Sequence, residues 1–225
     1  MTTMRWIRRA TVLAALVAAP VAFADFNGSL DQLVPAQGLQ RTQLAGLGLA
    51  SVRPGASLGS YDRVLLEPVD VSFRRDWKPY RTGSVIPLGP QEREALRKDV
   101  ARSVQQAFAA TLPQHGLVLA NEAGPGVLRM KLKVVDVYLN NPWTPTPGRS
   151  RVLAASSGEM TLVAELSDAR SGELLLRAGD WQDMRNPGRL LPSNDVRTGW
   201  DVDRTAQLWA SAVADAMRPP RGVSP

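Results

Sequence analysis

Residues 90–112 read PQEREALRKDVARSVQQAFAATL, and this stretch decides the fold of the chain. Its apolar side chains recur at intervals of three and four residues, which places them on one face of a helix. Pro90 suits the first position of a helix, and Pro113 cannot continue one. The stretch therefore predicts a long amphipathic helix. Its apolar face is formed by Leu96, Val100, Val104, Ala107, Phe108 and Leu112.

Strand patterns flank this helix on both sides. Upstream, apolar residues between Val64 and Phe73 predict a strand. Pro68 lies within it and marks a bulge or a sheet edge, because proline cannot donate to a ladder. Downstream, residues 117–119 predict a second strand. A strand, a long helix and another strand form a crossover unit, which we expect to be right-handed with parallel strands.

The rest of the chain adds strands and a closing helix. Apolar and polar residues alternate over 127–139, and the alternation changes phase near Val134, which predicts a β-bulge. Residues 160–166 and 174–178 predict a hairpin, and residues 202–216 a helix with Asp201 as N-cap. The predicted order is β-α-β-β-β-β-α. The fold class is α/β, more closely an α+β two-layer sandwich, with two long helices packed on one face of a mixed sheet.

The two ends of the chain have a different character from the predicted domain, which covers residues 61–218. Residues 1–24 predict a signal peptide, with a basic start, an apolar core and a small-x-small cleavage site between Ala24 and Asp25. Residues 25–60 are rich in Gly, Gln and Leu without a sustained period and predict an extended arm. Residues 219–225 predict a flexible tail.

Cysteine is absent from all 225 residues. A lipid-anchored envelope protein needs a cysteine directly after the cleavage site, and a disulfide-stapled protein needs pairs of them. The signal peptide and the missing cysteine together predict a soluble, unanchored protein of the periplasm.

Charge and hydropathy argue against nucleic-acid binding and against a transmembrane segment. The formal net charge is +6, from 27 basic and 21 acidic residues, and removal of the predicted signal takes away three arginines. The remaining excess is small and dispersed, whereas nucleic-acid binding needs a concentrated basic stripe. Beyond the signal, no stretch approaches the ~20 apolar residues of a membrane helix. We therefore expect neither a nucleic-acid partner nor a transmembrane segment in the mature chain.

Three loop-to-strand junctions carry a resemblance to a known family. They are RPGA-x-L-x-x-YDRVLLEPV at residues 53–69, GPGVLR at 124–129 and AEL-x-DA-x-SGE at 164–173. On these motifs the chain resembles a bacterial envelope family of unknown function, domain of unknown function three-three-one-three, over about residues 30–217. Many members look like lipoproteins, and this chain differs from them because it lacks the lipidated cysteine. The resemblance implies an envelope location and supplies no catalytic residues.

Motifs for common chemistries are missing. His115 is the only histidine and follows the first helix, where a cation stabilises the helix C-terminus, so we interpret it as a cap. One histidine without cysteine excludes a zinc site of the usual ligands. The chain also lacks a G-x-S-x-G elbow, phosphate-binding loops and a calcium loop. We therefore predict no catalytic residues, no metal and no cofactor.

Carboxylates leave one enzymatic alternative open, because a pair of them could hydrolyse an envelope glycan. The competing interpretation is that strand carboxylates such as Glu159 and Glu165 form ion pairs with Arg129, Lys131 and Lys133 on a neighbouring strand. The hydrolase candidates are Asp70, Asp76, Asp136, Glu165 and Asp180.

Two loops are the best candidates for a binding surface. Residues 74–81 interleave cations with aromatics, and residues 140–147 are a proline-stiffened segment with one tryptophan. An equal alternative is that their tryptophans fold back as lids over the sheet. The three tryptophans Trp181, Trp200 and Trp209 are expected to pack in the core. The candidate binding residues are Arg75, Trp77, Tyr80, Arg81 and Trp143.

Taken together, these features predict a non-catalytic accessory or binding protein of the cell envelope, whose partner is an envelope protein or a cell-wall component. Two alternatives remain. One is the glycan hydrolase, and the other is a structural subunit that assembles through the arm at residues 25–60. The sequence leaves the oligomeric state open.

Overall fold

The computed structural model describes residues 30, 38–80, 86–140, 153–185, 191–192 and 195–218. The predicted signal peptide with its Ala24 to Asp25 junction, and the predicted tail at 219–225, lie outside the described residues. So do Arg81 and Trp143.

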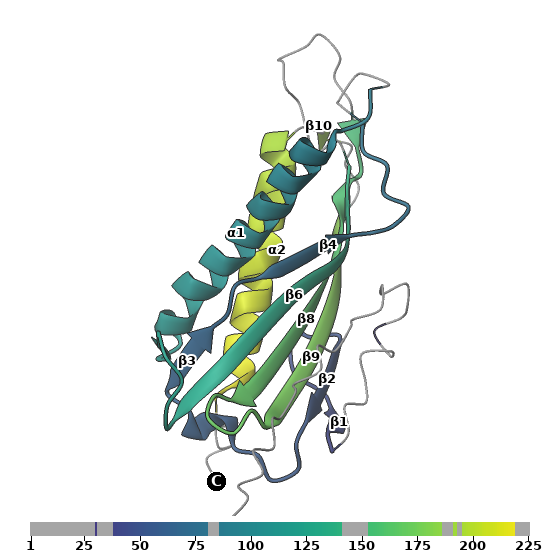
Figure 1. The fold of residues 1–225 in the computed structure, drawn as a ribbon. Coiled ribbons are helices and arrows are strands. Elements are labelled where there is room, and N and C mark those ends of the chain that lie inside the picture. Colours follow the sequence, from purple (N-terminus) through teal and green to yellow (C-terminus); the bar gives the residue numbers. More distant parts are fainter. Residues whose placement is uncertain are drawn as a thin grey trace, which may run out of the picture.

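Two long helices, α1 (Pro90–Gln114) and α2 (Asp195–Ala216), lie side by side on one face of a mixed sheet (Figure 1). The sheet has eight strands in the order β1-β2-β9-β8-β6-β3-β5, and β4 also pairs with β6. This arrangement confirms the predicted α+β class with both helices on one face. The strands are β1 (Gln40–Thr42), β2 (Leu49–Val52), β3 (Arg63–Leu66), β4 (Asp70–Phe73), β5 (Val118–Leu119), β6 (Val127–Leu139), β8 (Ser156–Asp168) and β9 (Leu174–Arg185).

The predicted crossover unit is present around α1. Helix α1 begins at Pro90 after the N-cap Gly89, whose backbone N–H donates to Glu92, and it buries the six predicted apolar residues. Strand β3 pairs in parallel with β5 on one side and with β6 on the other. The expected strand at residues 64–73 is split at Pro68 into β3 and β4, because proline interrupts the ladder.

The bulge in β6 lies two residues beyond its predicted position. The register with β8 shifts between Val135 and Tyr138, and Asp136 takes a left-handed φ of 52°. The buried side of the strand changes there from Val134 to Val137, which explains the change of phase in the sequence. The predicted hairpin is formed by β8 and β9, which pair in antiparallel register over their length.

Residues 38–60, the described second half of the predicted arm, are not an extended arm. Strand β2 pairs with β9, and β1 pairs with β2, so both belong to the main sheet. Ala50 and Ser51 are fully buried in this position. These strands have three and four residues, which is too short for a hydrophobic period to show in the sequence.

Two further details differ from the expectations. Helix α2 begins six residues before Asp201, which lies within the helix, pairs with Arg197 and accepts a hydrogen bond from Ser157. The small antiparallel sheet of β7 (Leu153–Ala154) and β10 (Leu191–Pro192) was not expected, since each strand has two residues.

The core fills the space between the helices and the sheet. Each large side chain withdrawn from water there contributes roughly 1.5 to 3 kcal/mol of stabilisation. Within the described residues, neither helix is apolar over a length that would span a bilayer. The largest fully buried side chains include Phe108 and Leu112 of α1, Trp209 of α2, and Leu128, Met130, Leu132, Met160, Leu162, Leu166 and Leu176 of the central strands.

Candidate functional site

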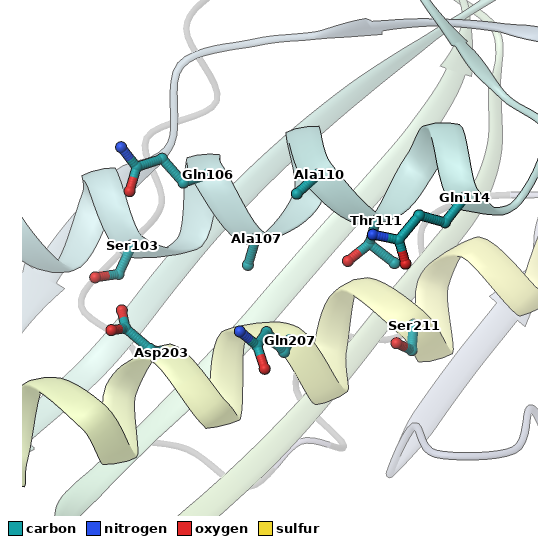
Figure 2. Close-up of a pocket in the computed structure, with 9 residues that line it drawn as sticks. All are labelled: Ser103, Gln106, Ala107, Ala110, Thr111, Gln114, Asp203, Gln207 and Ser211. Atoms are coloured by element: carbon teal, nitrogen blue, oxygen red, sulfur yellow. The ribbon is translucent and has the colours of Figure 1, made fainter.

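A groove runs between α1 and α2 on the side of the helices that faces away from the sheet (Figure 2). Its volume is about 560 Å³, within the usual range of small-ligand sites. Its lining residues come from both helices and are drawn in Figure 2. They are Ser103, Gln106, Ala107, Ala110, Thr111 and Gln114 of α1, and Asp203, Gln207 and Ser211 of α2. In this view Ser103 and Asp203 point toward each other.

Residue spacing explains why a groove remains between two packed helices. On α2 the lining residues Asp203, Gln207 and Ser211 follow at intervals of four, so they form one stripe. On α1 the lining side chains nearest the centre are Ala107 and Ala110, which are too small to fill the space. Larger apolar residues of both helices, such as Phe108 and Trp209, belong to the buried core, whereas the residues that line the groove are small or polar.

The lining is polar and almost uncharged. Asp203 is the single ionisable residue among the nine that line the groove. Three glutamine amides each offer an acceptor and two donors, and three hydroxyls offer both roles. This chemistry suits a neutral ligand rich in hydrogen-bonding groups. The groove could not be predicted from the sequence, because its two stripes lie about 100 residues apart in the chain.

The loop singled out in the sequence is divided between core and surface. Trp77 is 5% exposed, stacks on Phe73 with ring centroids 4.1 Å apart, and donates from Nε1 to the Leu139 carbonyl at 2.9 Å. Of the two alternatives for Trp77, the structure shows packing against the sheet. Arg75 and Tyr80 are exposed. The structure therefore does not bring Trp77 to a surface that Arg75 and Tyr80 could share with it.

An arginine that the sequence analysis did not select organises this end of the sheet. Arg74 Nε lies 2.8 Å from Asp76, its Nη1 pairs with Glu159, and its guanidinium stacks 4.2 Å from the Tyr138 ring centroid. Burial alone would lower the pKa of Arg74, but its bonds to Glu159 and Asp76 raise it above the ordinary value. Burial raises the pKa of the neighbouring Asp136 carboxyl, against the opposing charge of Arg74.

The carboxylates proposed for a hydrolase lie at separate places in the fold, where they contact other residues of the protein. Asp76 pairs with Arg74, and Glu165 pairs with Arg177 on β9. Asp180 is buried under α2, where it accepts hydrogen bonds from the Gly48 N–H at 3.0 Å and from Trp209 Nε1 at 2.8 Å. Asp70 lies beside Lys133 in the ladder between β4 and β6. These contacts stabilise the fold.

The strand carboxylates form ion pairs, but with other partners than expected. Glu159 pairs with Arg74 rather than with a residue of β6, and Arg129 pairs with Glu67 at 2.8 Å. Strands β6 and β8 are neighbours as expected, with Lys131 opposite Glu165, but the ion pair of Glu165 is made with Arg177 on β9. The sequence could not predict this choice, because β9 offers a second neighbour on the other side of β8.

Tryptophans divide between core and surface in a way that the sequence did not predict. Trp209 is 1% exposed, as expected, but Trp181 is 49% and Trp200 68% exposed, so the expectation that they pack in the core is wrong. His115 is the C-cap of α1 as predicted, and its Nδ1 lies 3.2 Å from Asp215 of α2.

The family-like motifs meet at one end of the sheet and serve its architecture. Tyr61 donates to Asp168 at 3.0 Å, and Arg53 donates to the Leu174 carbonyl at 2.8 Å. Asp168 also accepts from the backbone of Arg170 and Ser171, and these hydrogen bonds lower its pKa, the Ser171 bond most. In the described part of the chain, no group of His, Asp and Glu side chains could hold a metal ion.

Fold and groove thus define a two-layer α+β protein with a ligand-sized groove in its helical layer. The chain belongs to DUF3313, a family of proteins of unknown function, whose model matches residues 24–213. This confirms the resemblance seen in the sequence motifs. No curated protein matches the chain.

Solved structures with distant likeness come from several bacteria. A PelC dodecamer from Paraburkholderia phytofirmans is 11% identical with a TM-score of 0.34, over 76% of this chain and 96% of that one. A DUF330 protein from Xanthomonas campestris is 8% identical with a TM-score of 0.40, over 71% and 85%. A DUF4136 protein from Bacteroides thetaiotaomicron is 9% identical with a TM-score of 0.36, over 80% and 96%. These values are too low to transfer a function.

Proposed function

We propose that the protein is a non-catalytic binding or accessory protein of the cell envelope, exported to the periplasm, and that the groove between α1 and α2 is its ligand site. The observation that supports this most is the lining of the groove. Its nine described lining residues offer many neutral donors and acceptors, and they include one carboxylate and no basic side chain. Hydrolysis by acid and base needs two positioned ionisable groups, so this site favours binding over catalysis.

The aromatic and cationic loop is a second contact surface in this proposal. Arg75 and Tyr80 are exposed there, and Arg81 and Trp143 follow from the sequence alone. Exposed Arg and Tyr side chains are typical of partner contacts. Such a surface would attach the protein to an envelope protein or a wall component while the groove holds a smaller ligand.

Filling the groove tests the proposal. Ala110 lines the groove and is exposed, so Ala110→Trp places a bulky ring in the groove without overpacking the core. The matched control is Lys98→Trp, on the opposite side of α1 and 66% exposed. The exported chain is the protein from Asp25 onward, without the predicted signal peptide. It is purified and mixed with isolated cell-wall sacculi and with washed envelope membranes, and sedimentation measures the bound fraction.

We expect the exported chain and Lys98→Trp to sediment with one of these fractions and Ala110→Trp to lose at least about tenfold in affinity, since a blocked pocket forfeits its ligand contacts. Thermal unfolding of all three chains checks that the variants fold. Equal binding by Ala110→Trp and Lys98→Trp would remove the groove as the ligand site. Release of product from sacculi by the exported chain would instead favour the hydrolase.

A further inference from the structure

Trp200 is the most exposed large apolar side chain of the described residues, with 68% of its surface accessible. Val196, one turn earlier on α2, is 56% exposed. A tryptophan left in water on a rigid helix forfeits much of the stabilisation that its burial would bring. Exposed tryptophans are enriched at contacts with ligands and partners, because the indole combines a large apolar face with a polar N–H.

Helical spacing places Trp200 in line with the groove. Trp200, Asp203, Gln207 and Ser211 follow one another at intervals of three, four and four residues, which keeps them on one face of α2. The last three form the α2 wall of the groove (Figure 2). The indole therefore continues that wall toward the N-terminus of α2. From Trp200 to Ser211 the stripe is ~16 Å long, at about 1.5 Å per residue.

We propose that this stripe and the facing wall of α1 bind a neutral oligosaccharide, with Trp200 stacked on one sugar ring. The inference rests on the groove being the ligand site and assigns the chemical class of its ligand. A pyranose ring presents C–H groups on one face and hydroxyls around its rim. The negative face of an indole attracts the former, and the groove supplies partners for the latter.

Amide side chains fit the rim of a sugar. Each glutamine can accept from one hydroxyl and donate to its neighbour, and the groove presents Gln106 and Gln114 from α1 and Gln207 from α2. Asp203 lies between Trp200 and Gln207 along the stripe and can accept from a hydroxyl of the stacked ring. A stripe ~16 Å long exceeds one hexose ring, so the ligand has several sugars.

The same lining argues against other ligands. An anionic ligand would need cations, and none of the nine described residues that line the groove is Lys, Arg or His. A peptide would need pockets for its side chains, whereas the apolar part of the lining consists of Ala107, Ala110 and the methyl group of Thr111. A neutral chain of hydroxyl-bearing rings matches both the missing charge and the missing pockets.

Isothermal titration of the exported chain tests this assignment with three probes. They are a β-linked glucose hexamer, a β-linked N-acetylglucosamine hexamer and, as the competing class, a neutral peptide of serine, glycine and alanine. The variants are Trp200→Ala, Trp200→Tyr and Gln207→Ala. The matched control is Leu208→Ala, a 55% exposed residue of α2 that does not line the groove. Circular dichroism verifies that each chain is folded.

The expected result is binding of at least one hexasaccharide and no binding of the peptide. Trp200→Ala should weaken it about tenfold, Trp200→Tyr should restore most of the loss because it keeps an aromatic face, and Leu208→Ala should match the parent chain. Failure of both hexasaccharides, or equal affinity in Trp200→Ala, overturns the saccharide assignment. The groove proposal is judged separately by Ala110→Trp, which asks where envelope material binds and not what its chemistry is.

Discussion

At the scale of single residues, Asp136 is expected to destabilise the fold when its carboxyl is ionised. It is a non-glycine residue with a left-handed φ of 52°, and burial raises the pKa of its carboxyl while Arg74 opposes the shift. A carboxyl with a raised pKa binds more protons in the folded state, so its contribution to stability falls as pH rises from its unfolded pKa through its folded one. Above that window the ionised group destabilises the fold.

Asp136→Asn removes this titration and keeps a residue that tolerates left-handed backbone. We expect the variant to gain stability relative to the parent chain as pH rises from about 4 to 7, near and above the ordinary pKa of aspartate. Urea unfolding at several pH values measures the difference, with Glu122→Gln on an exposed loop as control. A difference in unfolding free energy that stays constant across this range would contradict the prediction.

The tryptophans show the limit of residue-scale reasoning from sequence. Trp77 and Trp200 both lie among charged and polar neighbours, yet Trp77 is buried against Phe73 and Trp200 is exposed on α2. Local composition cannot tell the buried tryptophan from the exposed one. Trp77 is buried where its indole N–H can donate to the Leu139 carbonyl, which lies 62 residues away in the chain. Trp209 was predictable because it falls on the apolar period of α2.

At the scale of elements, the turn between β1 and β2 is held against α2. Gly46 in this turn has a φ of +77°, and a Cβ added there would meet the Ala212 Cβ at 2.9 Å. Gly55 has the same φ of +77° but nothing within 4 Å of an added Cβ. The two glycines therefore separate the cost of the backbone conformation from the cost of the contact with α2.

Gly46→Ala should destabilise the protein by about 1 to 3 kcal/mol more than Gly55→Ala, because only the first must displace the turn from the helix. Urea unfolding of both variants at neutral pH measures this difference. Equal losses would show that the turn does not rest on α2 and that the left-handed backbone alone sets the cost.

Elements with a long period were predictable, and short ones were not. Helix α1 and the pair β8 and β9 follow from periods sustained over many residues. Strands β1 and β2 have no such period, and they become strands only because β9 offers an edge for pairing. The groove belongs to the same class, since its polar stripes become a site only when the sheet sets α1 and α2 side by side (Figure 1).

At the scale of the whole molecule, residues 38–60 decide whether the sheet is complete. Strand β2 covers the edge of β9 from Leu176 to Gly179, and Arg53 extends this junction through the Leu174 carbonyl and Glu173. Leu39, Ala50 and Leu58 are buried in the process. If these residues were an independent arm, as the sequence predicted, their removal would leave the domain intact.

We expect the opposite for a chain that begins at Tyr61. Three apolar side chains lose their burial, which costs about 5 kcal/mol at ~1.5 to 3 kcal/mol for each large one, out of a total that is typically about 5 to 15 kcal/mol. The uncovered edge of β9 would also pair with other copies. Urea unfolding and light scattering, compared with the chain that begins at Asp25, should show a lower midpoint and aggregation. A shortened chain that does not aggregate and keeps an unchanged midpoint would show that these residues are an independent arm.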